Sequence, residues 1–433
     1  MERFEQRQSR IGYGNGRRMA AALLVGIAFV VTAVPLAGAQ TFTVIHNFNG
    51  TDGSQPFAGV TRDTAGNLYG TTQYGGILSC DNGGVPGCGV AYKLRPLNSG
   101  WLFSVLHQFQ GNDGNFLPTD PGNITLAPNG VPYGPQVMGG GGFNGLIYNL
   151  QPPVTAPANA NAPWSYTVDH VFGMGNDGGG PSQVTFDPAG NIFGTAIGGG
   201  IGNSGVVYEL TPTNGGWTET ILYSFLGGSD GNEPDAVSLD ESGNIFGLTR
   251  AGGDSACGDN NGCGTIYELT RSGSGWTKTI LHVFEEATDG STPGPLLRDS
   301  AGNLYGVTAM ATSGGGTIWE LSPSNGGWVF SVLYTLPGRS GTLSLVFRPV
   351  MDASGALYGV NNYIGANNVG SVYKLAPSNG GWTYTDLHDF GSLPNQTDGC
   401  FPRGPVALDP TGNIYGTTQQ CGAGAGVIYE VSP

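Results

Sequence analysis

The stretch TDGSQPFAGVTRDTAGNLYGTT (residues 51–72) decides the fold, because a close copy of it, TDGCFPRGPVALDPTGNIYGTT, returns at residues 397–418. Self-similarity at a regular spacing is the signature of repeat architectures. The aromatic residue of the GNLYG motif marks seven copies, 53–64 residues apart: Tyr69, Tyr133, Phe193, Phe246, Tyr305, Tyr358 and Tyr415. The chain is therefore read as seven repeat units.

Each unit is expected to form four strands. Segments such as VALD, NIYGTT, GVIYEV and WTYTDLHDF are short, rich in β-branched and aromatic residues, and bounded by Gly, Asn, Asp or Pro. The last unit ends one strand short, and its missing segment stands at the other end of the chain as TFTVIHNF (residues 41–48). The sequence predicts an all-β, seven-bladed β-propeller of four-stranded blades, whose last blade is completed by strand 41–48. A β-helix would need no such closure.

The first 39 residues are typical of an export signal. A basic region ends at Arg17-Arg18, an apolar run extends from Met19 to Val34, and Ala37-Gly38-Ala39 has the small-x-small form of a cleavage site. We expect a signal peptide over residues 1–39, cleaved after Ala39, and one propeller domain over residues 40–433. The protein would be secreted or periplasmic.

The six cysteines are expected to form three local disulfides. Two pairs each share one glycine-rich loop, Cys80 with Cys88 and Cys257 with Cys263. Cys400 and Cys421 lie on two loops that project from the same face of an up-and-down blade, so they are expected to be neighbours. Disulfides fit an oxidising compartment. Zinc is the rival interpretation, and it is disfavoured because no Cys-x2-Cys pair and no adjacent His is present.

The charge balance argues against two classes of partner. The chain has a formal charge of −15; removing residues 1–39 takes away five Arg and two Glu, so 11 basic and 29 acidic residues leave −18. Phosphate binding requires clustered Lys and Arg, and these are scattered singly. We therefore expect the surface to repel nucleic acid and anionic membrane. We also expect no membrane span, because the apolar run is short for a spanning helix, and a monomer.

The five histidines occupy one repeat position, two residues before a Phe: His46, His107, His170, His282 and His388. Tyr223 and Tyr334 hold that position in the other two units. A position filled in every unit is typical of a packed side chain that hydrogen-bonds a neighbour, whereas catalysis needs one distinct site. No further His is available for a Ser-His-Asp arrangement.

An Asp-Gly pair in the loops between units is the candidate ligand-binding set: Asp52, Asp113, Asp177, Asp230, Asp289 and Asp398. The remaining loop carries Arg339 and Ser340 instead. Carboxylates on one face of a ring suit calcium, the candidate cofactor, or sugar hydroxyls. Asp-Gly is also among the commonest turn pairs, so a purely structural role is the alternative.

The pattern of Asp, GNLYGTT, GTIYEL and Gly-Trp resembles the GloVer tandem repeat of secreted bacterial proteins with a choice of C-terminal anchors. The resemblance covers residues 41–433 and implies an exported, propeller-like repeat protein; it supplies no catalytic residues. The phrase DPTGNIYG is also similar to one in propeller lyases and sugar-lactone hydrolases, whose His or clustered metal site is not found in this sequence.

Three functions remain open at this stage. The first is a binding or interaction module for carbohydrate or peptide, and it is preferred. The second is a polysaccharide lyase or glycosidase that uses the carboxylates of Asp230, Glu233 and Asp235, since two carboxylates at a suitable distance supply an acid and a base. The third is a structural component of the cell surface.

Overall fold

The computed structural model describes residues 40–77, 80–82, 85–110, 113, 122–139, 142, 144–153, 164–253, 257, 261–311, 314–338 and 347–433. Within it, Gln40–Pro433 forms one compact unit. Two turns of 3-10 helix, Gly228–Asp230 (η1) and Pro394–Gln396 (η2), interrupt an otherwise all-β arrangement of these residues.

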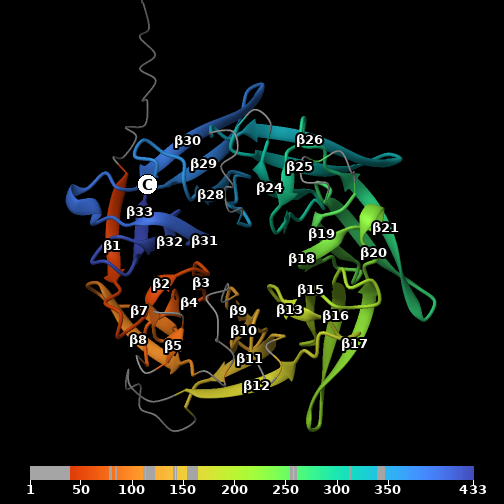
Figure 1. Cartoon of the computed structure of the whole chain (residues 1–433). Helices are drawn as coiled ribbons and strands as arrows, with labels where there is room; N and C mark the ends of the chain where they lie inside the picture. Colours follow the sequence, from red (N-terminus) through yellow and green to blue (C-terminus); the bar gives the residue numbers. More distant parts are fainter. Residues whose placement is uncertain are drawn as a thin grey trace, which may run out of the picture. The chain divides into compact units, whose positions relative to one another are not determined.

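Seven antiparallel sheets follow one another around a ring (Figure 1), which confirms the predicted propeller. Blade 1 contains β2 (Ser54–Pro56), β3 (Thr61–Arg62), β4 (Leu68–Tyr74), β7 (Val90–Pro96) and β8 (Trp101–Gln108). Blade 2 contains β9 (Thr125–Leu126), β10 (Pro132–Gln136), β11 (Leu146–Gln151) and β12 (Ser165–Val171). Blade 3 contains β13 (Gly179–Pro181), β14 (Thr185–Phe186), β15 (Ile192–Gly198), β16 (Val206–Thr213) and β17 (Gly216–Ser224).

The second half of the ring repeats the same order. Blade 4 contains β18 (Asn232–Leu239), β19 (Ile245–Ala251), β20 (Thr265–Ser272) and β21 (Gly275–Val283). Blade 5 contains β22 (Ser291–Pro293), β23 (Leu297–Arg298), β24 (Leu304–Met310), β25 (Thr317–Ser324) and β26 (Gly327–Thr335). Blade 6 contains β27 (Val350–Met351), β28 (Leu357–Asn361), β29 (Ser371–Ser378) and β30 (Gly381–Asp389). A small hairpin, β5 (Asp81–Asn82) and β6 (Val85–Pro86), lies in a loop of blade 1.

The last blade joins the two ends of the described chain. Blade 7 consists of β31 (Cys400–Leu408), β32 (Ile414–Gln420) and β33 (Val427–Ser432), with β1 (Thr41–Asn47) as its outermost strand. β1 pairs antiparallel with β33, Thr41 opposite Ser432 and Asn47 opposite Val427. In Figure 1 the red strand β1 lies beside the blue strand β33. The predicted closure by the N-terminal strand is confirmed.

Two motifs of the repeat form one packing unit. The Gly that follows each marker aromatic lies under a fully buried ring of the neighbouring strand, and any side chain there would overlap the ring. Only glycine fits at a position whose Cα packs directly against an aromatic ring, because it has no Cβ. The pairs are Gly70–Tyr92, Gly134–Tyr148, Gly194–Tyr208, Gly247–Tyr267, Gly306–Trp319, Gly359–Tyr373 and Gly416–Tyr429.

The turn before each marker aromatic is held by an Asp side chain. In blade 1, Asp63 accepts hydrogen bonds from the backbone N–H and the side-chain amide of Asn67. Gly66, with φ of 86°, provides the left-handed residue that the turn requires. The same contacts recur between Asp187 and Asn191, Asp240 and Asn244, Asp299 and Asn303, and Asp409 and Asn413. These residues build the blades, as the sequence indicated.

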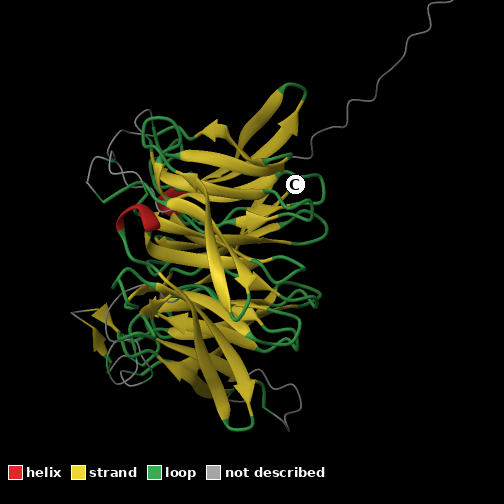
Figure 2. Ribbon diagram, turned by 90° about the vertical axis from the view of Figure 1, so that its right-hand side faces the viewer, coloured by secondary structure: helices red, strands yellow, loops and turns green. Residues whose placement is uncertain are grey.

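The loops between blades and the loops between the second and third strands share one face, which we call the Asp-Gly face. Backbone hydrogen bonds join the two kinds of loop, for example from Gly200 N–H to Gly175 O and from Gly253 N–H to Gly228 O. Both 3-10 turns lie on this face, and Figure 2 shows them on the same side of the sheets.

All three predicted disulfides are present, Cys80–Cys88, Cys257–Cys263 and Cys400–Cys421, with Cα atoms 5.3–5.7 Å apart. They lie in loops of the Asp-Gly face or at its edge. In the described part of the chain, none of the helical segments has the length and apolar character needed to cross a membrane.

Candidate functional site

The histidines of the repeat contact the aspartates of the Asp-Gly pairs. Nε2 of the His lies 2.9–3.2 Å from a carboxylate oxygen in His46–Asp52, His107–Asp113, His282–Asp289 and His388–Asp398. In the loop between blades 3 and 4, the hydroxyl of Tyr223 donates a hydrogen bond to the carboxylate of Asp230 at 2.7 Å. The predicted structural role of the repeat His, a packed side chain that hydrogen-bonds a neighbour, is confirmed for His107, His282 and His388. Nε2 of His46 contacts Asp52 but forms no hydrogen bond with a described residue.

The same carboxylates also hold the backbone of their loops. Each accepts a hydrogen bond from an N–H that lies one or two residues after the buried Phe: Asn49 to Asp52, Gln110 to Asp113, Gly173 to Asp177, Leu226 to Asp230, Glu285 to Asp289 and Ser392 to Asp398. All six side chains therefore contribute to their turns. Their contact with a ligand or with calcium stays a prediction, and Arg339 and Ser340 lie outside the described residues.

Hydrogen bonding lowers the pKa of several of these carboxyl groups. Burial alone would raise the pKa of Asp289, but hydrogen bonds from His282, Thr288 and the Glu285 backbone, with the charge of His282, lower it below its usual range. The pKa of Asp230 is lowered in the same way, against the effect of burial, chiefly by Lys278. Charge-assisted hydrogen bonds favour the ionised carboxylate.

An aromatic belt connects successive blades at the same level. The ring at each repeat-His position stacks on an aromatic ring from the outermost strand of the next blade, with centroids 3.8–4.6 Å apart and planes within 12° of parallel. The stacked pairs are His388–Phe42, His46–Phe103, His107–Tyr166, His282–Phe330 and Tyr334–Tyr384.

Two adjacent positions of the belt carry a charged residue in place of the second ring. Between blades 3 and 4, Lys278 lies over the Tyr223 ring and binds Asp230 with Nζ 2.7 Å from Oδ1. Between blades 2 and 3, Glu219 of β17 faces His170 of β12, with Oε2 3.5 Å from Nε2. The belt is thus interrupted on both sides of blade 3.

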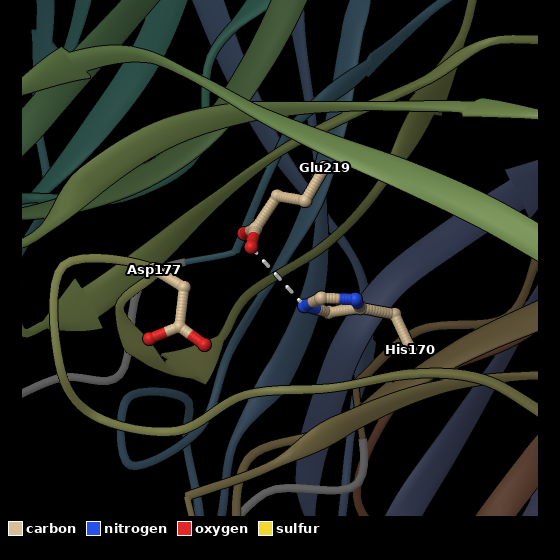
Figure 3. Close-up of side chains that lie close together, drawn as sticks. All are labelled: His170, Asp177 and Glu219. Carbon is tan, nitrogen blue, oxygen red and sulfur yellow. Dashed lines mark ion pairs between the residues drawn. The ribbon is translucent and has the colours of Figure 1, made fainter.

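The second interruption brings together the one group of three His, Cys, Asp or Glu side chains, among the described residues, that could hold a metal ion. The potential ligand atoms of His170, Asp177 and Glu219 lie within 4.8 Å of one another. Figure 3 shows the three side chains converging from β12, the following loop and β17. Burial, with the charge of Asp177, raises the pKa of Glu219 to about 7. Burial also lowers the pKa of His170, against the opposing charge of Asp177.

Sequence reasoning placed His170 and Asp177 in separate uniform sets and missed Glu219. A signal was present: Glu219 stands four residues before the repeat-His position, where five other units have Phe or Tyr. Only Glu219 and Lys278 place a charge at this otherwise aromatic position, and such a change marks a departure from the packing pattern of the repeat.

The carboxylates proposed for a lyase or glycosidase are not equivalent. Asp235 is buried and binds Arg250, with Nε and Nη2 at 3.0 and 2.8 Å from Oδ2. Asp230 binds Tyr223 and Lys278. Glu233 lies in the left-handed region, with φ of 57°. No observation in the described residues favours this trio as an acid and base pair, and the catalytic hypothesis stays untested.

Three positions after the Asp of five of the pairs, the described residue lies in the left-handed region of backbone conformation. Gln55, Gly180, Glu233, Thr292 and Phe401 have φ of 52–68°, and each donates its N–H to a loop carbonyl of the preceding blade. Non-glycine residues held at positive φ concentrate at functional sites. Gln55, Glu233, Thr292 and Phe401 are half-buried and differ in chemistry from blade to blade, so they are candidates for ligand contact on the Asp-Gly face.

A cavity of about 120 Å³ lies between the innermost strands, lined by Thr61, Ile124, Thr125, Leu126, Gln183, Val184, Thr185, Ala236, Val237, Leu296 and Arg348. These lining residues come from six blades, and none of them has a carboxylate side chain. Arg348 forms no hydrogen bond or ion pair with any described residue, and its Nε atom is buried. Burial lowers the pKa of Arg348, yet a guanidinium stays protonated in proteins.

Comparisons with known proteins agree with this architecture. The model of the Gloeobacter/Verrucomicrobia repeat matches residues 26–260 and 256–433. Comparison with curated proteins gave no match.

Two similar solved structures come from B. thetaiotaomicron. The extracellular domain of a candidate one-component system has a TM-score of 0.52 at 11% identity, over 90% of this chain and 40% of that one. The extracellular domain of a candidate hybrid two-component system has a TM-score of 0.51 at 12% identity, over 91% and 41%. These likenesses show a shared fold, and this chain spans about two fifths of each relative.

Proposed function

This chain belongs to the Gloeobacter/Verrucomicrobia repeat family, the GloVer repeat expected from its sequence. Because its cavity is also lined by Arg348, which has no partner among the described residues, we propose that the protein is an exported binding module. Its ligand is a carbohydrate or peptide that presents an anionic group to Arg348. The fold shared with two extracellular domains and the three disulfides support a place outside the cytoplasm.

Arg348 carries this proposal. Arg348 is half-buried, and its buried Nε has no partner among the described residues. A charge that is partly desolvated without a partner is unfavourable, and an opposite charge that enters the site recovers part of the lost solvation. The guanidinium presents five N–H donors in a planar fork that matches a carboxylate or phosphate. Gln183 and Thr185 add polar side chains to the same cavity wall. The bound state would therefore relieve a cost that the free protein bears.

The size of the cavity limits what enters it. A volume of about 120 Å³ admits a carboxylate or phosphate group with a few waters, and it is too small for a whole saccharide ring with its neighbours. The rest of the ligand would lie outside the cavity. The lining residues Thr61, Leu126 and Thr185 pair with the first residues of the second strands, so the cavity lies toward the end of the ring opposite the Asp-Gly face.

The test is equilibrium binding to two panels: oligosaccharides with and without uronic acids, and peptides with free or amidated C-termini. We expect binding only to members with a carboxylate, and at least tenfold weaker binding by Arg348→Gln. The matched control is Arg271→Gln, because Arg271 is exposed and stacks on Trp276. Equal binding by both variants would overturn the role of Arg348. If the protein bound no member of either panel, a role as a structural component of the cell surface would be favoured.

A further inference from the structure

At one interface between blades the aromatic belt is replaced by a set of metal-ligating groups. Elsewhere Nε2 of the repeat His lies within 3.2 Å of the Asp of its own loop. Asp177 instead accepts the N–H of Gly173 at 2.9 Å, and His170 faces Glu219 of the next blade. Both regular contacts of the repeat His, the loop Asp and the stacked ring, are therefore absent at His170.

The groups at this interface lack the partners that buried polar atoms require. Nε2 of His170 and Oε1 of Glu219 are buried and have no hydrogen-bond partner among the described residues. The 3.5 Å separation of Nε2 from Oε2 is too long for a well-formed hydrogen bond. Buried polar atoms are nearly always satisfied, so two orphans at one point need an explanation.

We propose that His170, Asp177 and Glu219 bind a first-row divalent cation, with zinc as the best fit, and that the ion joins blade 2 to blade 3. Two ligands about 2.1 Å from a tetrahedral zinc ion lie about 3.4 Å from each other. That spacing agrees with the His170–Glu219 separation of 3.5 Å. Small rotations of the side chains would bring all three atoms, now within 4.8 Å of one another, to the same ion.

The donor set decides between cations. One imidazole and two carboxylates suit zinc and related transition metals, whereas calcium and magnesium prefer oxygen ligands alone. Two carboxylates also neutralise the charge of a divalent ion, so the complete site buries no net charge. Its remaining coordination positions would hold water.

The function of this metal site would be to cross-link blades 2 and 3 at the interface where the stacked aromatic pair is missing. β12 supplies His170, β17 supplies Glu219, and the loop between blades supplies Asp177 (Figure 3). An ion that binds only the folded ring stabilises it by mass action. The site is separate from the cavity of Arg348 and does not depend on the ligand proposed there.

The test uses purified, tag-free protein stripped with chelator, titrated with zinc chloride and with calcium chloride by calorimetry. We expect one zinc ion per chain, a rise in melting temperature with zinc, and no effect of calcium. Glu219→Gln and His170→Gln should bind zinc at least tenfold more weakly. His282→Gln, at a regular His–Asp pair, is the matched control and should bind zinc as the wild type does.

A second variant separates metal binding from folding. Glu219→Phe restores the aromatic residue found at this position in other units, so it should stack on His170 and fold. Its melting temperature should not respond to zinc. The proposal is overturned if the wild type binds no zinc at 100-fold molar excess, or if Glu219→Phe and His282→Gln respond to zinc equally.

Discussion

The imidazole of His282 lies parallel to the phenyl ring of Phe330 in the next blade, with centroids 3.8 Å apart and an angle of 2° between the planes. Nε2 of the same imidazole contacts Asp289 at 2.9 Å. One side chain thus links a loop to its own strand and two blades to each other. Five such pairs are present around the ring, and they give a physical reason for the ring residue at this position in those five units.

The stack should contribute a measurable coupling energy. In a double-mutant cycle of His282→Ala and Phe330→Ala, the free energies of unfolding should deviate from additivity by about 0.5–1.5 kcal/mol. The control cycle combines His282→Ala with Phe103→Ala, whose ring stacks on His46 at another interface. That pair should be additive within about 0.5 kcal/mol. Equal deviations in both cycles would contradict an energetic role for the stack.

The stabilising effect of Asp289 should depend on pH. Its folded-state pKa lies below the usual value of 3.8, so its stabilisation is present above 3.8 and disappears as the pH falls through the folded-state pKa. Asp289→Asn should lower the free energy of unfolding at pH 6 by about 1–3 kcal/mol, and the difference from wild type should shrink below pH 3.8.

Urea unfolding of both proteins between pH 3 and 7 checks this dependence. The exposed carboxylate Glu241, changed to Gln, serves as the control and should show no such trend. A difference for Asp289→Asn that stays constant with pH would rule out an electrostatic origin.

The three disulfides should stabilise unequally. Cys400–Cys421 closes a separation of 21 residues, against 8 and 6 for the other two pairs. Its replacement by two Ala should cost about 3 kcal/mol, roughly 1 kcal/mol more than the loss of Cys80–Cys88, because a longer loop gains more entropy on release. Chemical unfolding of the three double variants measures the order, and a larger loss for Cys80–Cys88 would contradict it.

The N-terminal strand should be essential for closure of the ring. Phe48 directly follows β1 and is fully buried, so Phe48→Ala should lower the free energy of unfolding by about 3–5 kcal/mol. Thr43→Ala, at an exposed position of β1, is the control and should change it by less than about 0.5 kcal/mol. Deletion of Thr41–Asn47 should leave the edge of β33 unpaired and cause aggregation in size-exclusion chromatography. A monomeric deletion variant with unchanged melting temperature would argue against closure by β1.

Export should remove the segment before the propeller. Mass spectrometry of the protein recovered from the periplasm or medium should find Gln40 as the first residue. Ala39→Leu should slow processing, because the cleavage site requires small residues. Recovery of a mature chain that begins upstream of Gln40 would refute the assigned site.

Much of the fold was predictable because its determinants are local. The Asp63–Asn67 turn, the Gly70–Tyr92 packing unit and the Cys80–Cys88 pair each lie within one repeat, and the pattern repeats seven times. The missing strand of the last unit also specified how the ring closes. The contact between the repeat His and the Asp of the Asp-Gly pair was not predicted. The two residues are nevertheless only 6 or 7 positions apart, in His46–Asp52 and His282–Asp289.

The sequence alone determined the number of blades, their strands and the position of the closing strand, since side-chain periodicity and turn residues act over a few neighbouring positions. Only the tertiary structure decided which exceptional side chains meet. Glu219 of blade 3 contacts His170 of blade 2, which lies 49 residues earlier in the chain. Arg348 lines a cavity whose other residues come from five further blades. Such encounters depend on how complete sheets pack around the ring, and residue spacing within one repeat does not encode that packing.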